Sequence, residues 1–211
     1  LKKSLNQNGW DGNWYKRAIN DEGQVIGSSS SRECKIDSIA QSWSIISEAG
    51  NNDKKYIALD SAQKHLIDEE HGLIKLLTPG FKGEEMKPGY IAKYPIGVRE
   101  NGGQYTHAAL WLIMAFAKIG FLDQAIKYLE MITPISHTET KEKTKIYKIE
   151  PYVLPGDIYS NKFMNGRGGW SWYTGSSSWY YKICLENILG LRKKGDKLYL
   201  PTNCPENWAR Y

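Results

Sequence analysis

Polar side chains gather directly before an apolar segment in the middle of the chain. The stretch 98–107 reads Val-Arg-Glu-Asn-Gly-Gly-Gln-Tyr-Thr-His. Arg99, Glu100, Gln104 and His107 offer charged and bidentate hydrogen bonds, and the two adjacent glycines permit close approach of the backbone. A helix N-terminus carries free N–H groups and partial positive charge, which favour an anion. The stretch predicts a contact surface for a sugar or a phosphate. The alternative is a capped helix start with His107 in the core.

A second stretch, 166–178, combines glycines, aromatic residues and hydroxyl groups: Gly-Arg-Gly-Gly-Trp-Ser-Trp-Tyr-Thr-Gly-Ser-Ser-Ser. The backbone N–H groups of 174–176, together with the Thr174 hydroxyl, are suited to cradle a tetrahedral anion. It is not a nucleotide phosphate loop, because no Gly-Lys-Ser/Thr follows at the required spacing. The alternative is a tight turn with core tryptophans.

Three carboxylates are further candidates for chemistry. Asp11 and Asp37 lie in the stretches Gly9–Ala18 and Glu33–Trp43, and Glu150 precedes Pro151. Asp11 and Asp37 suit a turn or a helix cap equally, and for Asp37 we favour the N-cap. The four histidines are scattered, so we expect neither a metal site nor a bound cofactor.

Composition narrows the class of protein. The 211 residues carry a net charge of +5 from 28 basic and 23 acidic side chains, which are dispersed along the chain, so we expect no nucleic-acid partner. The three cysteines form no CxxC pair, which fits a reducing, cytoplasmic setting. Tyrosine and tryptophan, at 14 and 8, far outnumber the 4 phenylalanines. Such flat side chains with a polar edge suit sugar ligands, and also ordinary core packing.

Membrane insertion and secretion are not expected. The longest apolar run, Ala108–Ala117, is much shorter than the roughly 20 residues that span a bilayer. The first residues lack the apolar core of a signal peptide, and they begin with Leu1 rather than Met. We therefore expect a segment of a longer, cytoplasmic chain.

Helical periodicity dominates the sequence. It predicts helices over 38–49, 53–67, 106–119, 122–131 and 177–189, with one strand over 197–200. Long loops rich in Gly, Pro, Tyr and Trp separate them, over 6–31, 76–103 and 133–169. Short turns at one end and long loops at the other indicate an all-α toroid of two helical layers with a site at one mouth. A doubly wound α/β fold is disfavoured, because β-rich runs do not alternate with the helices.

Five motifs occur in an order that resembles glycoside hydrolase family 94, the inverting glycoside phosphorylases. They are Trp10–Arg17, Ile36–Trp43, Gly97–Trp111, Glu150–Val153 and Gly166–Ser176. The similarity covers about Leu5 to Trp208, and the segments 36–43 and 94–99 are most similar to the β-1,2-glucan branch of that family. The resemblance implies an (α/α)6 barrel between β-domains. Residues 1–191 would form about the C-terminal half of the barrel, and 192–211 the start of a C-terminal β-region.

The resemblance also implies site residues. His107, Thr174 and Gly175 fall on family positions that bind phosphate, and Arg99 with Glu100 falls on the Lys/Arg-Glu pair that lines the sugar site. We further expect sugar contacts from Gln104, Tyr105, Trp170 and Trp172. The family's general acid is an Asp in an Asp-Trp-Asn-Asp-like motif, which these residues lack, so no catalytic residue is expected here and Asp11 does not replace it.

The implied activity is reversible cleavage of β-glucosides or β-glucan oligosaccharides by inorganic phosphate, with inversion, giving an α-sugar 1-phosphate. Expected partners are the oligosaccharide, phosphate as co-substrate and the remainder of the parent polypeptide, with a homodimer as a further option. The alternatives are an inverting hydrolase of the same fold and a non-catalytic carbohydrate-binding fragment.

Overall fold

The computed structural model describes residues 1–85, 87–172 and 174–200. Its α-helices are, in chain order, α1 (Lys2–Asn8), α2 (Ser38–Ile46), α3 (Asn52–Leu66), α4 (Thr106–Lys118), α5 (Leu122–Met131), α6 (Pro134–Thr138), α7 (Lys141–Tyr147) and α8 (Ser176–Ile183). A short 3-10 helix covers Gly89–Lys93, and a π-helical turn, Cys184–Ile188, continues α8.

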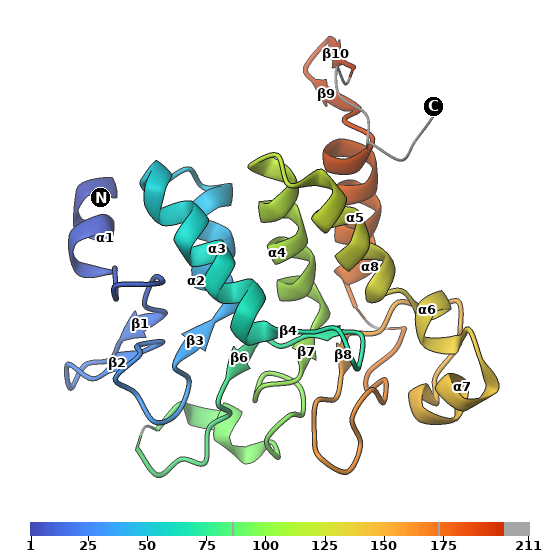
Figure 1. Cartoon of the computed structure of the whole chain (residues 1–211), viewed down its shortest axis with the longest axis horizontal. Helices are drawn as coiled ribbons and strands as arrows, with labels where there is room; N and C mark the ends of the chain where they lie inside the picture. Colours follow the sequence, from blue (N-terminus) through green and yellow to red (C-terminus); the bar gives the residue numbers. More distant parts are fainter. Residues whose placement is uncertain (86, 173, 201–211) are drawn as a thin grey trace.

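The strands are very short and form antiparallel pairs that join loops to one another. The pairs are β1 (Ala18–Ile19) with β2 (Val25–Ile26), β3 (Ile36–Asp37) with β6 (Leu77–Thr78), β4 (Ile67–Asp68) with β5 (Leu73–Ile74), β7 (Gln104–Tyr105) with β8 (Asp157–Ile158), and β9 (Arg192–Lys194) with β10 (Lys197–Tyr199). The last pair is a hairpin that projects beyond the helices (Figure 1).

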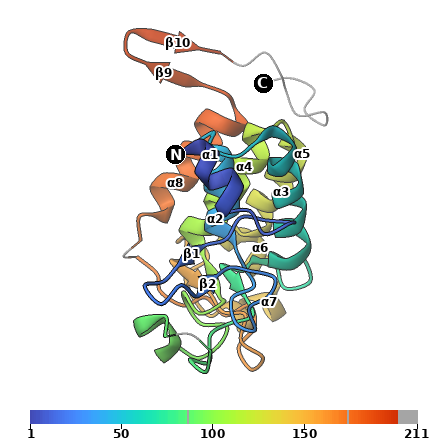
Figure 2. The same ribbon diagram turned by 90° about the vertical axis from the view of Figure 1, so that its left-hand side faces the viewer.

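The helices pack in two layers. α2, α4 and α8 stand side by side with similar axes (Figure 1), and α3 and α5 lie on the opposite side from α8 when the molecule is turned (Figure 2). α4 is central, because it packs against α2, α5 and α8. The long loops gather at one end of the helices, and the short α2–α3 and α4–α5 connections lie at the other. The fold is mostly helical, as expected, and closure into a toroid stays a prediction.

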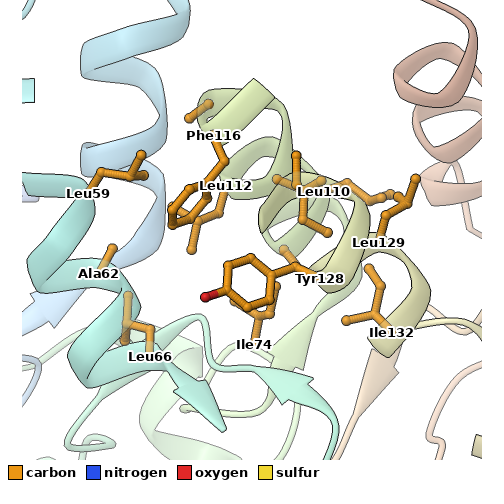
Figure 3. Packing of buried hydrophobic residues seen from close by; sticks show 14 of the residues in the cluster. Leu59, Ala62, Leu66, Ile74, Leu110, Leu112, Phe116, Tyr128, Leu129 and Ile132 are labelled. Carbon is orange, nitrogen blue, oxygen red and sulfur yellow. The ribbon is translucent and has the colours of Figure 1, made fainter. Parts of the chain in front are cut away.

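The core forms around α4, whose apolar run lets it be buried on most sides. Figure 3 shows its side chains meeting those of α3, α5 and β5. The labelled core residues are Leu59, Ala62, Leu66, Ile74, Leu110, Leu112, Phe116, Tyr128, Leu129 and Ile132. Tyr128 and Phe116 pack edge to face, with ring centroids 5.3 Å apart. This packing fixes the start of α4, which includes His107 and directly follows the rest of the polar stretch 98–107.

The expected helices are present, with shifted ends. The helix expected over 38–49 ends at Ile46, and the helix expected over 177–189 is α-helical only to Ile183. The expected strand over 197–200 is β10. Residues 201–211 of the expected β-region, including Cys204, lie outside the described residues.

The expectation of unstructured loops is wrong in three places. The loop 133–169 contains α6, α7 and β8, the loop 6–31 begins inside α1 and holds the β1–β2 hairpin, and the loop 76–103 contains β6 and the 3-10 helix. α6 and α7 were missed because they are too short to show an apolar stripe at helical spacing. The signal in their sequence is instead the side-chain cap at the start of each helix. The Thr133 and Thr140 hydroxyls accept hydrogen bonds from the N–H groups of Ser136 and Lys143.

Candidate functional site

Three distant segments are joined at the start of α4. In the β7–β8 pair, Tyr105 lies opposite Asp157. The Thr106 N–H donates to the Gly156 carbonyl at 3.0 Å, and the Gly156 N–H donates to the Trp170 carbonyl at 2.6 Å. The two glycine-containing stretches therefore meet, although residues 108–165 separate them in the chain.

A cavity of about 310 Å³ opens where they meet. Its lining residues are Arg99, Glu100, Tyr105, His107, Gly156, Asp157, Trp170, Thr174 and Gly175. The structure thus places seven of the nine candidate site residues around one space. Their roles toward a ligand stay predictions.

His107 and Gly175 lie next to each other in the wall of this cavity. His107 is the second residue of α4, and Gly175 is the N-cap of α8, so two helix N-termini converge. A Cβ at Gly175 would lie 3.2 Å from His107 Nε2. Burial lowers the pKa of His107, so its imidazole is neutral at neutral pH and has one N–H to donate.

The Thr174 hydroxyl completes this side of the cavity. It lies 2.7 Å from the Ser176 hydroxyl, and its oxygen accepts the Ser176 N–H at 3.1 Å. The hydroxyl is therefore held at the first turn of α8, where free N–H groups point outward.

Arg99 is held between two aromatic rings. Its guanidinium carbon lies 5.5 Å from the centre of the Tyr94 ring and 5.3 Å from that of Trp170. It donates to the Tyr94 hydroxyl at 3.4 Å, and this bond raises the pKa of Arg99. The guanidinium has further N–H donors beyond this bond, and such a donor fork suits phosphates and paired hydroxyls.

Glu100 connects this cavity to a larger one. The second cavity, of about 740 Å³, shares Glu100, Tyr105 and His107 with the first. Glu100 accepts from the Tyr90 hydroxyl at 3.4 Å through Oε1, while its Oε2 is buried without a hydrogen-bond partner among the described residues. Aromatic and apolar side chains, including Tyr90, Phe81 and Trp111, line the larger space.

Asp157 is a cavity residue that the sequence reasoning missed. Its side chain is 2% exposed, and Oδ1 accepts the Trp170 N–H at 2.7 Å. Burial raises the pKa of Asp157, and the Trp170 N–H and the Arg99 charge oppose that shift. A Cβ at Gly169 would lie 2.4 Å from Asp157 Oδ2, so only glycine leaves room for this carboxyl group. The Asp-Ile-Tyr stretch after Pro-Gly was the available signal, and it indicates a strand rather than chemistry.

Two of the predicted sugar contacts lie elsewhere. Gln104 is fully buried and its Oε1 accepts the Ile74 N–H at 2.9 Å, so it joins β7 to β5 instead of facing the cavity. Trp172 is not among the residues that line the cavity, and its indole N–H donates to Glu150 Oε1 at 2.9 Å. Glu150 therefore anchors a tryptophan and does not line the cavity.

The other candidate carboxylates make local structural contacts, although Asp37 also lines the larger cavity. Asp37 caps α2 by accepting the Ile39 N–H at 2.8 Å, as we favoured, and it pairs with Arg17 at 3.5 Å. Burial raises the pKa of Asp37, and the Arg17 charge opposes this shift. Asp11 accepts from the Ser28 hydroxyl at 2.9 Å and organises a turn.

The described part of the chain contains no group of three or more His, Cys, Asp or Glu side chains placed to hold a metal ion. In the same residues, no helix has the length and apolar character needed to cross a membrane.

The chain belongs to the glycosyl hydrolase 94 superfamily. The model of that family's catalytic domain matches residues 1–190. The chain is 45% identical to the cyclic beta-(1,2)-glucan synthase NdvB of Rhizobium meliloti, over all of the chain and 8% of the synthase. It is 26% identical to a solabiose phosphorylase of Paenibacillus borealis, over 99% of the chain and 27% of that protein. An N,N'-diacetylchitobiose phosphorylase of Vibrio furnissii is 28% identical, over 96% of the chain and 25% of that protein. The chain thus spans about a quarter or less of these relatives.

Proposed function

We propose that this chain supplies the phosphate and sugar site of a glycoside phosphorylase. The parent enzyme would cleave a β-glucoside or a β-glucan oligosaccharide with inorganic phosphate, reversibly and with inversion, to give an α-sugar 1-phosphate. The observation that carries the proposal is the single cavity that His107, Thr174 and Gly175 share with Arg99. The names of the solabiose and chitobiose phosphorylases support it.

Phosphate would bind between the starts of α4 and α8. The neutral His107 imidazole, the Thr174 hydroxyl and the backbone N–H groups in the first turn of α8 would supply donors for its oxygens, except the Ser176 N–H, which already donates to Thr174. Arg99 adds positive charge nearby. In a space partly closed to water, such preorganised donors stabilise a dianion far more than the same groups do in bulk solvent.

The sugar would extend from this cavity into the larger one. Both spaces meet at Glu100, whose unpartnered Oε2 is an acceptor suited to a sugar hydroxyl. Tyr105 lines both spaces and offers an aromatic wall. The bond to be broken would therefore lie beside His107, within reach of phosphate.

The reaction balances without a second catalytic carboxylate. An acid from the remainder of the polypeptide, an Asp in the family, gives its proton to the glycosidic oxygen as the bond to the anomeric carbon breaks. A phosphate oxygen forms the new bond from the opposite face, which inverts the configuration. An inverting hydrolase would instead need a carboxylate base and a water there.

We infer that the chain forms about half of an (α/α)6 barrel and that the β9–β10 hairpin begins a β-region.

The test uses the full-length parent enzyme. Thr174→Ala and His107→Ala should each raise the KM for phosphate by about ten- to a hundredfold, because each removes a hydrogen bond to a charged group. The KM for the glucoside should change much less. The control is Ser178→Ala, which removes an exposed hydroxyl from α8, the helix that follows Thr174. Unchanged phosphate kinetics in both variants would reject the assignment. Activity without phosphate would favour the hydrolase, and sugar binding without turnover would favour a binding module.

A further inference from the structure

Trp172 is held in an unusual position. Its φ of 69° lies in the left-handed region, which bulky residues rarely adopt, and its side chain is 63% exposed. Neither feature is explained by burial in the core. Strain of this kind persists only where the surrounding structure fixes it, and it is common at ligand sites.

Glu150 fixes the indole ring. Its Oε1 accepts the indole N–H of Trp172 at 2.9 Å, and this bond lowers the pKa of Glu150, so the carboxylate is ionised at neutral pH. A side-chain hydrogen bond from Ser171 also lowers the pKa of Glu150. Because the indole N–H is already occupied, the ring offers a ligand its apolar aromatic surface.

A second exposed ring stands beside the first. Tyr152 is 76% exposed and meets Trp172 edge to face, with ring centroids 6.5 Å apart. We call Glu150, Tyr152 and Trp172 the rim platform. Rings fixed in advance lose little conformational freedom when a ligand binds.

The rim platform adjoins the cavity. A Cβ at Gly156 would lie 3.4 Å from the Trp170 carbonyl oxygen and 3.7 Å from Thr174 Cβ, so Trp170 and Thr174 both lie close to Gly156 in the cavity wall. Trp172 lies between these two lining residues in the sequence, so it is close to the cavity without lining it. A ligand that leaves the cavity past Trp170 or Thr174 would therefore come near the rim platform.

We propose that the rim platform is an additional sugar subsite, which stacks one glucosyl unit of an oligosaccharide outside the reaction cavity. The C–H face of a pyranose ring is apolar and matches an aromatic face, while its hydroxyls remain in water. This proposal rests on the proposed function and deepens it, because it assigns the enzyme a substrate longer than a disaccharide.

The experiment compares substrate lengths in the full-length enzyme. The measured quantity is kcat/KM for a longer β-1,2-linked gluco-oligosaccharide divided by kcat/KM for the disaccharide, at saturating phosphate. Trp172→Ala should lower this ratio about three- to tenfold, the range expected for one aromatic contact. Glu150→Ala should lower it as well, because the indole loses its anchor. Glu150→Gln keeps an acceptor oxygen and should largely preserve the ratio.

Phe163→Ala is the matched control, since Phe163 is an 87% exposed aromatic residue outside the rim platform. Its ratio should equal that of the wild type. An unchanged ratio in Trp172→Ala would overturn the proposal. That includes an equal loss of kcat/KM for both lengths, which would mean that Trp172 only supports the local fold. If the wild-type enzyme did not require phosphate, the proposed function would fail, and the length ratio would still report on the rim platform.

Discussion

Gly175 illustrates at the residue scale how closely the cavity's groups are fitted together. Its φ of −78° is open to any residue, so backbone strain does not explain a glycine there. What it provides is space, since a Cβ would lie 3.2 Å from His107 Nε2. The same reasoning applies to Gly169, which makes room for the buried carboxyl group of Asp157.

Gly175→Ala should therefore impair phosphate use without unfolding the protein. We expect the KM for phosphate to rise about tenfold, because the added methyl group displaces the imidazole from the anion. The thermal midpoint should stay close to that of the wild type. Steady-state kinetics with phosphate varied is the measurement, and an unchanged KM would contradict the placement of phosphate between α4 and α8.

Gly169→Ala should instead destabilise the parent protein, by about 1–3 kcal/mol, because the methyl group overlaps the Asp157 carboxyl group. Gly156→Ala is the matched control, since its Cβ would meet nothing closer than 3.4 Å. Denaturant unfolding compares the two variants. Equal stabilities would show that Asp157 can move aside at little cost.

At the scale of elements, α4 holds the site in place because it is buried against α2, α5 and α8. Ile113 is fully buried in this helix, whereas Ile135 in α6 is 74% exposed. Ile113→Ala should lower the free energy of unfolding by about 2–5 kcal/mol, and Ile135→Ala by far less. Denaturant unfolding again measures both. A small loss for Ile113→Ala would mean that α4 is not the central core helix.

α6 is attached to the β4–β5 hairpin through a histidine. His137 is buried, stacks on Tyr147 with ring centroids 5.0 Å apart, and lies 3.0 Å from the Gly72 carbonyl. Burial lowers the pKa of His137, with a contribution from the Lys143 charge, although the Gly72 carbonyl opposes the shift.

This lowered pKa predicts a pH dependence. The unfolded state, with a histidine pKa of about 6.5, binds the proton more readily than the folded state does. Stability is therefore lost as the pH falls through about 6.5 toward the folded pKa. His137→Gln should reduce the fall in thermal midpoint between neutral pH and about pH 5. An identical fall in the wild type and the variant would exclude His137 as a source of acid sensitivity.

The sequence predicted the elements that bury an apolar stripe and missed those that do not. α2, α3, α4 and α5 were found because their apolar residues recur at helical spacing, whereas α7 is rich in lysine and depends on its Thr140 cap. The site was predictable where glycines and polar groups cluster locally. Asp157 was missed, and Gln104 and Trp172 do not line the cavity, because strand pairing and side-chain direction decide these positions and neither leaves a local signature.

At the scale of the whole molecule, we propose that the stretches 98–107 and 166–178 meet to bind phosphate beside a sugar. The most direct measurement follows the products of the full-length enzyme with a β-1,2-linked gluco-oligosaccharide by nuclear magnetic resonance, with and without inorganic phosphate. The account predicts α-glucose 1-phosphate, formed only when phosphate is present and nearly abolished when His107 and Thr174 are both replaced by alanine. Release of free glucose at the same rate without phosphate, unaffected by these replacements, would contradict it.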